Sequence, residues 1–153
     1  MPSGAQELPA GSYSSHIQLG VALRSKEEVL WTVGQTLVSA GDVSPRWAVA
    51  LLEKELRQAN FLTGDIALAE AAPEFNREIA RTAFVLVQMP QGLDWGNGRT
   101  VQLALGLAGK GDQAHLDLLG ALVAVLTRRA AVRRLLRTTD PAEAARILGS
   151  SAE

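Results

Sequence analysis

The segment Lys54-Glu-Leu-Arg-Gln-Ala-Asn60-Phe-Leu-Thr-Gly-Asp-Ile66-Ala-Leu-Ala-Glu70 carries most of the information about the fold of this 153-residue chain. Its first residues complete a helix that we predict to end near Gln58. Asn60 begins a turn, and the apolar residues 66–68 then form a short strand. The strand leads into Glu70, whose carboxylate we expect in a loop. A helix, a turn, a strand and a charged loop residue therefore follow one another in this segment.

The residues before this segment predict one strand and two helices. Apolar residues alternate with other residues from Ile17 to Leu23, as in a short strand. Ser25-Lys-Glu-Glu28 is a capping box, because the serine can accept a hydrogen bond from a free amide while the glutamate reaches back. The helix that it opens should end at Gly41, and Ser44-Pro45 should cap and begin the second helix.

The residues after this segment predict two more strands and three helices. The β-branched and aromatic run 81–89 is typical of a buried strand, and Gly96-Asn97-Gly98 indicates a turn before a strand at 100–107. Helical periods and caps predict helices at about 112–126, 128–136 and 140–149. The predicted order is β-α-α-β-β-β-α-α-α, which indicates an α/β protein.

The predicted elements form a single domain over residues 15–150. A chain of this length can bury one sizeable core, and no repeat or linker divides it. Residues 1–14 are rich in glycine, proline and serine and have no apolar period. We therefore expect these residues to be a mobile leader.

The composition excludes several classes of function. A formal net charge of −1 provides no overall field that would attract nucleic acid or anionic lipid. The absence of cysteine excludes disulfides and thiolate chemistry, and two histidines alone give no support for a zinc site, so no metal or cofactor is expected. The longest apolar run, Leu118–Leu126, is too short to span a bilayer, and no secretory signal is visible. We expect a cytoplasmic protein without membrane insertion.

Four motifs occur in the order and spacing of one bacterial family. They are the segment 54–70, which matches without a gap; Ser25–Glu28 after the first strand; Gly92-Leu-Asp-Trp-Gly-Asn-Gly98, against a Gly-x-x-Trp-x-x-Gly turn; and His115-Leu-Asp-Leu-Leu119, against His-Leu-x-x-Leu. On these motifs, residues 16–149 resemble the enzyme IIA domains of fructose, mannitol or nitrogen-regulatory type from the sugar phosphotransferase system. The resemblance implies a three-layer α/β/α sandwich around a mixed β-sheet.

The resemblance also implies a degenerate phosphoryl-transfer site with Glu70 and His115 as the candidate catalytic residues. The family histidine that carries the phosphoryl group stands where this chain has Glu70, and both flanking residues are alanines here. Lys54 replaces an arginine that pairs with the phosphohistidine. His115 matches a second histidine that hydrogen-bonds the phosphoryl group. Asn60 stands where the family usually has threonine, so Lys54 and Asn60 are the candidate phosphoryl- or anion-binding residues.

The glutamate at position 70 changes the chemistry that the site can perform. An imidazole is a neutral nucleophile near pH 7, whereas a carboxylate is already charged and forms only a labile acyl phosphate. Three roles remain open for Glu70: a solvated loop carboxylate in a decayed site, a fixed negative charge, or an acyl-phosphate acceptor. His115 is a helix histidine kept for a hydrogen bond, an anion-site residue or the acceptor itself. Lys54 is a surface lysine at a helix C-terminus or a partner in an ion pair.

The fixed-charge role makes a geometric prediction. If Glu70 stands in for a phosphorylated histidine, its carboxylate should lie within about 4 Å of the Lys54 ammonium or within hydrogen-bond reach of His115. Lysine keeps the charge of the family arginine but loses the planar fork of donors that suits phosphate. A single ion pair is therefore the most that we expect from Lys54.

These features favour an enzyme IIA-like domain that lacks the usual phosphoryl-accepting histidine and acts in regulation or partner binding. One alternative is an active phosphoenolpyruvate-dependent sugar phosphotransferase component, a phosphoryl carrier with an altered acceptor. Another alternative is a protein-interaction scaffold without phosphoryl chemistry. The expected partners are the histidine-containing phosphocarrier protein, an enzyme IIB, a transporter or a regulator. The sugar or regulatory target and the oligomeric state stay open.

One basic helix concentrates positive charge. At helical spacing Arg129, Arg133 and Arg137 form a stripe. The stripe is either a solvated face or a docking face for an acidic protein or nucleic acid. Because no aromatic residues are interleaved with the arginines, base stacking has no support and nucleic acid is not the expected partner.

Overall fold

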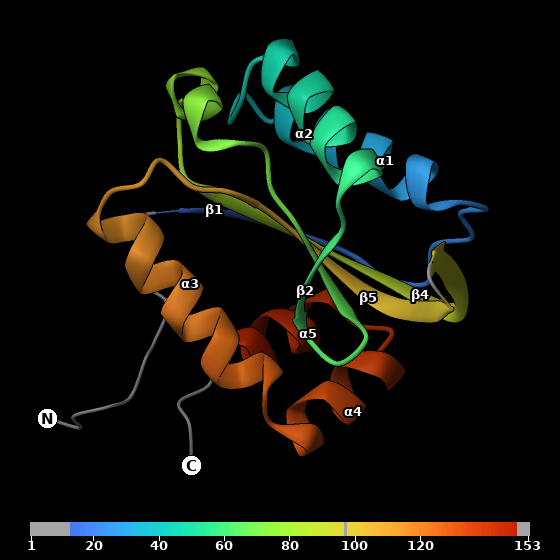
Figure 1. Ribbon diagram of the computed structural model, residues 1–153. Coiled ribbons are helices and arrows are strands. Elements are labelled where there is room, and N and C mark those ends of the chain that lie inside the picture. The colour runs from blue at the N-terminus through green and yellow to red at the C-terminus, as the bar shows by residue number, and fades with distance from the viewer. Residues whose placement is uncertain (1–12, 97, 150–153) are drawn as a thin grey trace, which may run out of the picture.

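The computed structural model in Figure 1 describes residues 13–96 and 98–149 and shows an α/β/α sandwich. The elements in chain order are β1 (Ser14–Gln18), α1 (Lys26–Ser39), α2 (Pro45–Arg57), β2 (Asn60–Thr63), β3 (Ile66–Ala69), the 3-10 helix η1 (Pro73–Glu78), β4 (Ala83–Gly96), β5 (Arg99–Ala108), α3 (Gln113–Leu126), α4 (Arg129–Arg137) and α5 (Pro141–Leu148). The predicted fold class is confirmed, and the strand, two helices, a run of strands and three helices follow in the predicted order.

The five strands form one mixed sheet in the order β1-β4-β5-β3-β2. β1 runs parallel to β4 and β3 runs parallel to β5, whereas β4–β5 and β2–β3 are antiparallel pairs. β2 is a strand that the sequence pattern did not indicate, because only Phe61 and Leu62 in it are apolar. Its pairing with β3 turns this polar-ended segment into a strand.

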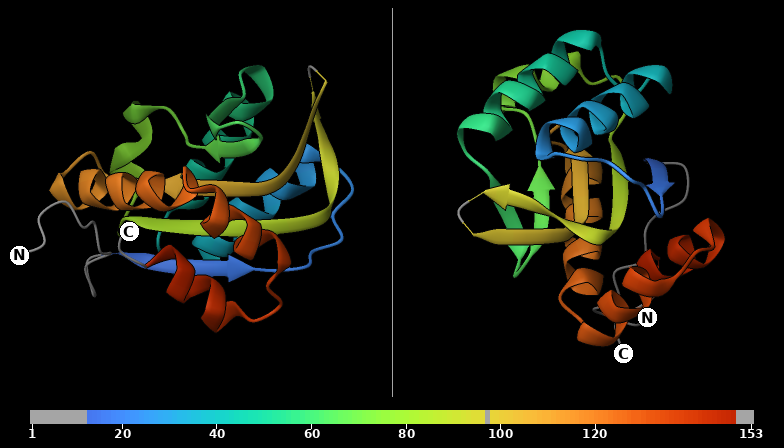
Figure 2. Two further views of the ribbon diagram at one scale, coloured as in Figure 1. Left: turned by 90° about the horizontal axis from the view of Figure 1, so that it is seen from below. Right: turned by 90° about the vertical axis from the view of Figure 1, so that its right-hand side faces the viewer.

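Helices cover both faces of the sheet. α1 and α2 pack on one face, and α3, α4 and α5 lie on the other (Figures 1 and 2). Alternate residues of β4 serve the two cores: Val85 and Val87 belong to the cluster under α1 and α2, while Phe84 and Leu86 belong to the cluster under α3–α5. A strand buried on both faces explains the continuous apolar run in its sequence.

The predicted helix starts are confirmed at α1 and α5, where a side chain caps the helix. Ser25 Oγ accepts a hydrogen bond from the Glu28 backbone at 3.1 Å, and Asp140 Oδ1 accepts one from the Ala142 backbone at 3.0 Å. Ser44 is also the N-cap residue of α2 and Pro45 begins this helix, as predicted. The Ser44 hydroxyl makes no capping hydrogen bond and donates to the Glu78 carboxylate instead, which ties α2 to η1.

The prediction for the first strand is wrong at both of its ends. β1 begins at Ser14, inside the predicted leader, and ends at Gln18 rather than near Leu23. The strand stops because Gly20 adopts a φ of +63°, a left-handed conformation that leaves the extended region. Residues 1–12 of the predicted leader and Asn97 of the predicted turn lie outside the described residues.

Within residues 13–96 and 98–149, none of the helices combines the length and the apolar character needed to cross a membrane.

Candidate functional site

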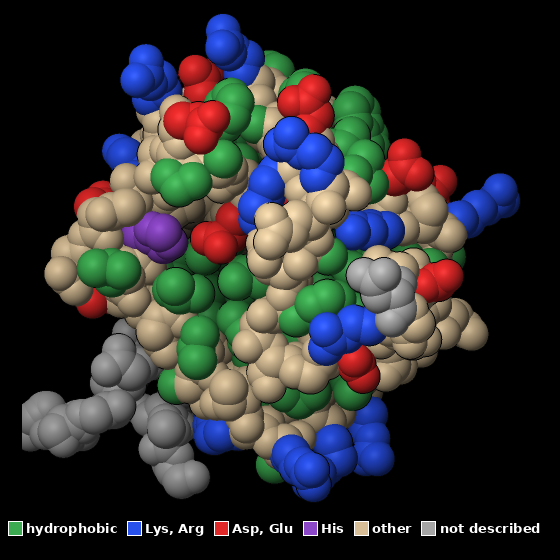
Figure 3. Space-filling view, viewed as in Figure 1, with side chains coloured by type: hydrophobic (Ala, Val, Ile, Leu, Met, Phe, Trp, Pro, Cys, Tyr) green, Lys and Arg blue, Asp and Glu red, His purple; other side chains and the backbone are tan. Residues whose placement is uncertain are grey.

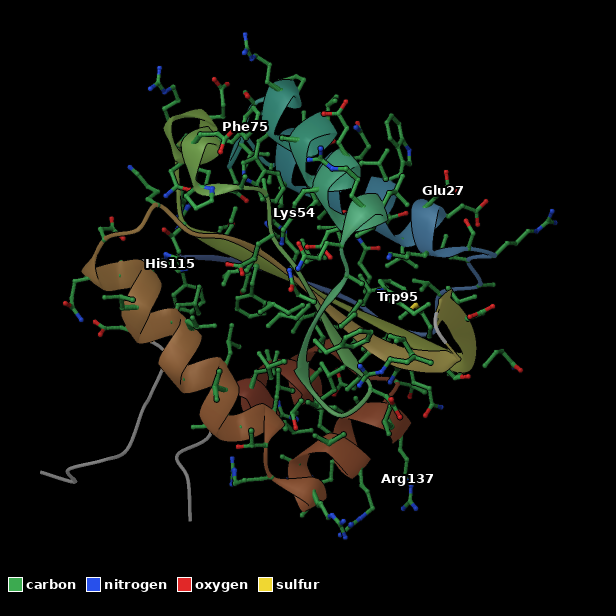
Figure 4. The ribbon with its side chains drawn as sticks, in the orientation of Figure 1. Glu27, Lys54, Phe75, Trp95, His115 and Arg137 are labelled. Atoms are coloured by element: carbon green, nitrogen blue, oxygen red, sulfur yellow. The ribbon has the colours of Figure 1, made fainter. Side chains whose placement is uncertain are left out.

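The candidate site lies where two parallel strands end beside two helix termini. β3 and β5 run side by side, so Glu70, which follows β3, and Gly109, which follows β5, emerge at the same edge of the sheet. Lys54 reaches this edge from the last turn of α2, and His115 reaches it from the first turn of α3. Figure 4 shows Lys54 and His115 on opposite sides of this edge.

A pocket of about 250 Å³ opens between these elements. Lys54, Glu70 and His115 all line it, so the structure brings together three of the four predicted site residues. Figure 3 shows histidine and acidic side chains next to one another on this face. The fourth residue, Asn60, does not line the pocket; it lies in β2 and pairs with Leu68 across the sheet.

The buried carboxylate of Glu55 binds two parts of the site. Its side chain is only 1% exposed, and one of its oxygens, Oε2, accepts two hydrogen bonds. Lys54 Nζ donates to it at 2.9 Å, and the backbone N–H of Glu70 donates to it at 3.2 Å. A buried carboxylate requires partners of this kind, because its desolvation is costly. Glu55 therefore joins the end of α2 to the loop after β3.

Sequence reasoning missed Glu55, although a signal was present. The buried residues Trp47, Leu51 and Glu55 are spaced by four along α2, so Glu55 falls on the apolar face of that helix. A charged residue on a buried face is a candidate for a structural or functional role.

The fixed-charge role predicts that Glu70 lies close to Lys54 or to His115, and the ion pair with Lys54 is not formed. The charges of Lys54 and His115 both act on the Glu70 carboxyl group. Lys54 pairs with Glu55, and within the described parts of the chain no ion pair or hydrogen bond joins the Lys54 ammonium to the Glu70 carboxylate. The physical reason is burial. Glu55 is the more deeply buried carboxylate, so it gains the most from the Lys54 ammonium.

His115 is held in one orientation by its own helix terminus. Its backbone N–H donates to Asp112 Oδ1 at 3.1 Å, which is the predicted cap of α3. Its ring nitrogen Nδ1 lies 3.1 Å from the backbone nitrogen of Gly111. Because a backbone N–H can only donate, Nδ1 is the acceptor, and in the neutral ring the proton sits on Nε2. Nε2 is buried and has no hydrogen-bond partner among the described residues.

Gly109 gives the His115 ring its place. A Cβ atom at position 109 would lie 2.2 Å from the ring carbon Cδ2, far closer than any non-bonded contact allows. Only glycine therefore lets the ring pack against the backbone after β5.

Burial of Glu70 dominates the electrostatics of the pocket. Burial is the largest influence on its carboxyl group and raises its pKa above the ordinary value of 4.5. The interactions with His115 and Lys54 lower the pKa, the charge of Glu55 raises it, and the net shift is upward. The site thus holds a partly desolvated carboxylate near an imidazole and an ammonium that is already paired.

Asn76 of η1 also lines the pocket, and nothing in its sequence context indicated this. The pocket holds no metal-binding set: across residues 13–96 and 98–149 no three His, Asp or Glu side chains are grouped so that they could bind an ion.

Comparison with known proteins identifies the family of this chain. The family described as "Phosphoenolpyruvate-dependent sugar phosphotransferase system, EIIA 2" matches residues 13–151. This chain belongs to that family. Two solved structures of mannitol enzyme IIA from Escherichia coli have the same fold as this enzyme IIA domain. One is its complex with phosphorylated enzyme IIB, with a TM-score of 0.78, 27% identity and coverage of 93% of this chain and 96% of the other. The other is a crystal structure, with a TM-score of 0.76, 27% identity and coverage of 87% and 95%.

Curated relatives agree with this assignment. The mannitol-specific phosphotransferase enzyme IIA component of Bacillus subtilis (strain 168) is 29% identical over 121 residues, which cover 79% of this enzyme IIA domain and 84% of the relative. A multiphosphoryl transfer protein of Haemophilus influenzae is 31% identical over 134 residues, which cover 88% of this chain. The same match spans only 27% of that longer protein.

Proposed function

We propose that this enzyme IIA domain does not carry a phosphoryl group and instead binds a protein partner through the pocket of Lys54, Glu70 and His115. One observation carries the proposal: Glu70, at the position where the resembled family has its phosphoryl histidine, lies in the same pocket as His115. The pocket thus contains a carboxylate where phosphoryl relay requires a neutral nucleophile.

The second residue that could act as nucleophile is tied to the backbone. His115 Nδ1 accepts a hydrogen bond from Gly111, so in the neutral ring the buried Nε2 bears the proton and has no free lone pair. A protonated Nε2 donates hydrogen bonds to an anion and does not attack phosphorus. The arrangement supports anion or partner recognition rather than phosphoryl acceptance.

The charges around the pocket also oppose a phosphoryl dianion. Lys54 is paired with Glu55 at 2.9 Å, so its charge is largely compensated before any ligand enters. A phosphoryl group beside Glu70 would meet a like charge in a partly desolvated site, which is unfavourable. The fixed carboxylate instead supplies a permanent negative charge that a partner can recognise.

Two exposed leucines are sequence neighbours of residues in the site. Leu116 follows His115 on α3 and is 58% exposed, and Leu56, which follows Glu55 at the end of α2, is 45% exposed. Exposed apolar side chains around a charged centre are typical of protein-binding surfaces. The partner in our proposal is an enzyme IIB, as in the complex of the E. coli relative, or the histidine-containing phosphocarrier, and the setting is the cytoplasm.

The test of phosphoryl transfer is intact-mass analysis after incubation with phosphoenolpyruvate, enzyme I and the phosphocarrier. We expect the unmodified mass at neutral and alkaline pH, while the B. subtilis mannitol enzyme IIA component gains one phosphoryl group in the same mixture. Addition of one phosphoryl group to this chain, mapped to His115 or Glu70, would overturn the proposal.

A binding titration tests the partner role. Glu70→Gln keeps the shape of the side chain and removes its charge, so it should weaken binding to the phosphocarrier or an enzyme IIB by about 1–3 kcal/mol. Leu116→Ser should weaken the same complex, and Glu74→Gln, an exposed carboxylate outside the pocket lining, is the matched control. If neither Glu70→Gln nor Leu116→Ser changes the affinity of a complex that forms, the domain is a scaffold that binds elsewhere.

An active carrier with an altered acceptor is the second candidate. One observation favours it: Nε2 of His115 is buried without a partner among the described residues, so the ring is poised for a new contact. Transfer to Nε2 would require the other ring tautomer, which breaks the hydrogen bond from Gly111. The mass measurement distinguishes the two candidates directly.

A further inference from the structure

A second and larger pocket lies at the far ends of β3 and α3 from Glu70 and His115. Its volume is about 640 Å³, and it is bounded by the β2–β3 turn, β5 and the junction of α3 with α4. It shares no lining residue with the pocket of Glu70. In Figure 1 the helix α3 extends from the edge where β5 ends to the neighbourhood of α4 and the β2–β3 turn. The two sites are therefore separate.

Positive charge gathers around this pocket. Three arginines (128, 129 and 133) and one acidic residue, Asp65, line it, in a chain whose net charge is −1. Asp65 is exposed and faces Arg99 at 3.7 Å, so it is compensated from outside the pocket. Arg129 and Arg133 form no ion pair or hydrogen bond with other residues of the described chain. Their guanidinium groups are available to an anion.

The floor of this pocket is apolar. The side chains of Ile66, Leu103 and Leu126 are each at most 6% exposed, and they lie beneath the partly exposed Val132 and Leu136. The hydroxyl-bearing residues Thr63, Thr100 and Thr127 line the same pocket. An apolar floor with a few convergent polar groups is the usual design of a small-molecule site, and the volume falls within the usual range for one.

We propose that this pocket binds a small organic phosphate, with its apolar body on the leucine floor and its phosphate held by Arg129 and Arg133. The planar guanidinium fork matches phosphate geometry, and two arginines one helical turn apart can grip one anionic group. An acidic helix or a nucleic acid would use the whole basic face, including Arg134 and Arg137. Figure 4 shows Arg137 pointing outward, and neither of these two arginines lines the pocket.

The experiment titrates naphthyl phosphate into the isotope-labelled chain and follows backbone amide shifts by NMR. Naphthyl phosphate carries an aromatic body and a dianion; naphthol and inorganic phosphate are the two half-ligands. We expect naphthyl phosphate to cause saturable shifts at Ile66, Thr100 and Val132. Each half-ligand should bind at least about tenfold more weakly than naphthyl phosphate. Shifts confined to Lys54, Glu70 and His115 would assign the ligand to the other pocket and overturn the proposal.

A pair of double variants makes the test specific. Arg129→Gln/Arg133→Gln should weaken naphthyl phosphate binding at least about tenfold. Arg134→Gln/Arg137→Gln removes the same charge from the same helix outside the pocket, and its affinity should stay within about threefold of the parent chain. All four arginines are exposed, so both variants keep the fold, as amide spectra will verify.

Equal losses in the two double variants would mean that only the general field of α4 attracts anions, and the pocket would not be a site. Tighter binding of a single-stranded oligonucleotide or an acidic peptide, weakened equally by both variants, would assign the face to a macromolecule and also overturn the proposal. Glu70→Gln should leave naphthyl phosphate binding unchanged, so this test does not depend on the proposed role of the first pocket.

Discussion

Lys54 Nζ lies 2.9 Å from Glu55 Oε2, and the same oxygen accepts the backbone N–H of Glu70 at 3.2 Å. One buried carboxylate thus fixes both the cation and the loop of the candidate site. The position of Glu70 is set by its main chain, while its side chain makes no hydrogen bond within the described residues. Recognition at this site can therefore change through the side chain at position 70 without loss of the loop.

The first prediction concerns Glu55. Glu55→Ala should lower the free energy of unfolding by about 2–4 kcal/mol, because it leaves the Glu70 amide without its acceptor and Lys54 without its partner. Lys54 is 24% exposed, so water recovers part of that loss. Glu55→Gln, which keeps an acceptor, should cost less. Urea unfolding measures both, with the exposed Glu53→Ala on the same helix as control; a Glu55→Ala effect no larger than that control would contradict the structural role.

The second prediction concerns pH and Glu70. Its pKa is raised in the folded state, so its contribution to stability is full below the ordinary value of 4.5 and is lost as the pH rises through the folded value. Glu70→Gln does not suffer this loss. The variant should therefore become more stable relative to the parent as the pH rises from acid to neutral.

Urea midpoints of both proteins across this pH range test the sign. The control Glu74→Gln should change the free energy of unfolding by no more than about 0.5 kcal/mol. A Glu70→Gln variant that loses stability relative to the parent toward neutral pH would contradict the raised pKa.

The third prediction concerns the contact between Gly109 and the His115 ring. Gly109→Ala should destabilise the fold by about 1–3 kcal/mol and displace the imidazole, since the new Cβ would lie 2.2 Å from it. Urea unfolding and the NMR shifts of the His115 ring report the two effects. Gly149→Ala is the control, because a Cβ there would meet Ala145 O at an ordinary 3.4 Å. Unchanged ring shifts in Gly109→Ala would show that the ring sits elsewhere in solution.

The fourth prediction concerns a buried amide far from the site. Gln88 is 2% exposed; its Nε2 donates to the carbonyls of Leu135 and Thr138, and its Oε1 accepts from the Gly20 backbone at 2.8 Å. Gln88→Leu leaves these three backbone groups without partners and should cost about 2–4 kcal/mol. The exposed Gln113→Leu should cost far less. A small effect of Gln88→Leu in urea unfolding would mean that water replaces the amide.

Much of the fold could be predicted because local signals and burial agree. The capping residues and helical periods located five helices to within a few residues, and the apolar run around Phe84 identified β4, which lies between β1 and β5. What failed depends on pairing between distant segments. β2 exists because β3 lies beside it, and β1 begins at Ser14 because that residue pairs with Ala83 of β4.

The sequence predicted which residues lie in the site better than it predicted the contacts between them. The motif pattern brought Lys54, Glu70 and His115 together, as the pocket does. It could not show that Lys54 prefers Glu55, because that choice depends on the relative burial of two carboxylates in three dimensions. Nor could the motif pattern show that Asn60 lies outside the pocket lining, because that depends on the pairing of β2 with β3.

The close contact between Gly109 and the His115 ring has a consequence for how such a domain evolves. Every residue other than glycine brings a Cβ atom, and at position 109 that atom would occupy the space of the imidazole. An exchange of the charged residue at position 70 needs no such accommodation. During evolution, a single substitution at position 70 can therefore change the chemistry of this pocket. Its shape, by contrast, requires positions 109 and 115 to change together.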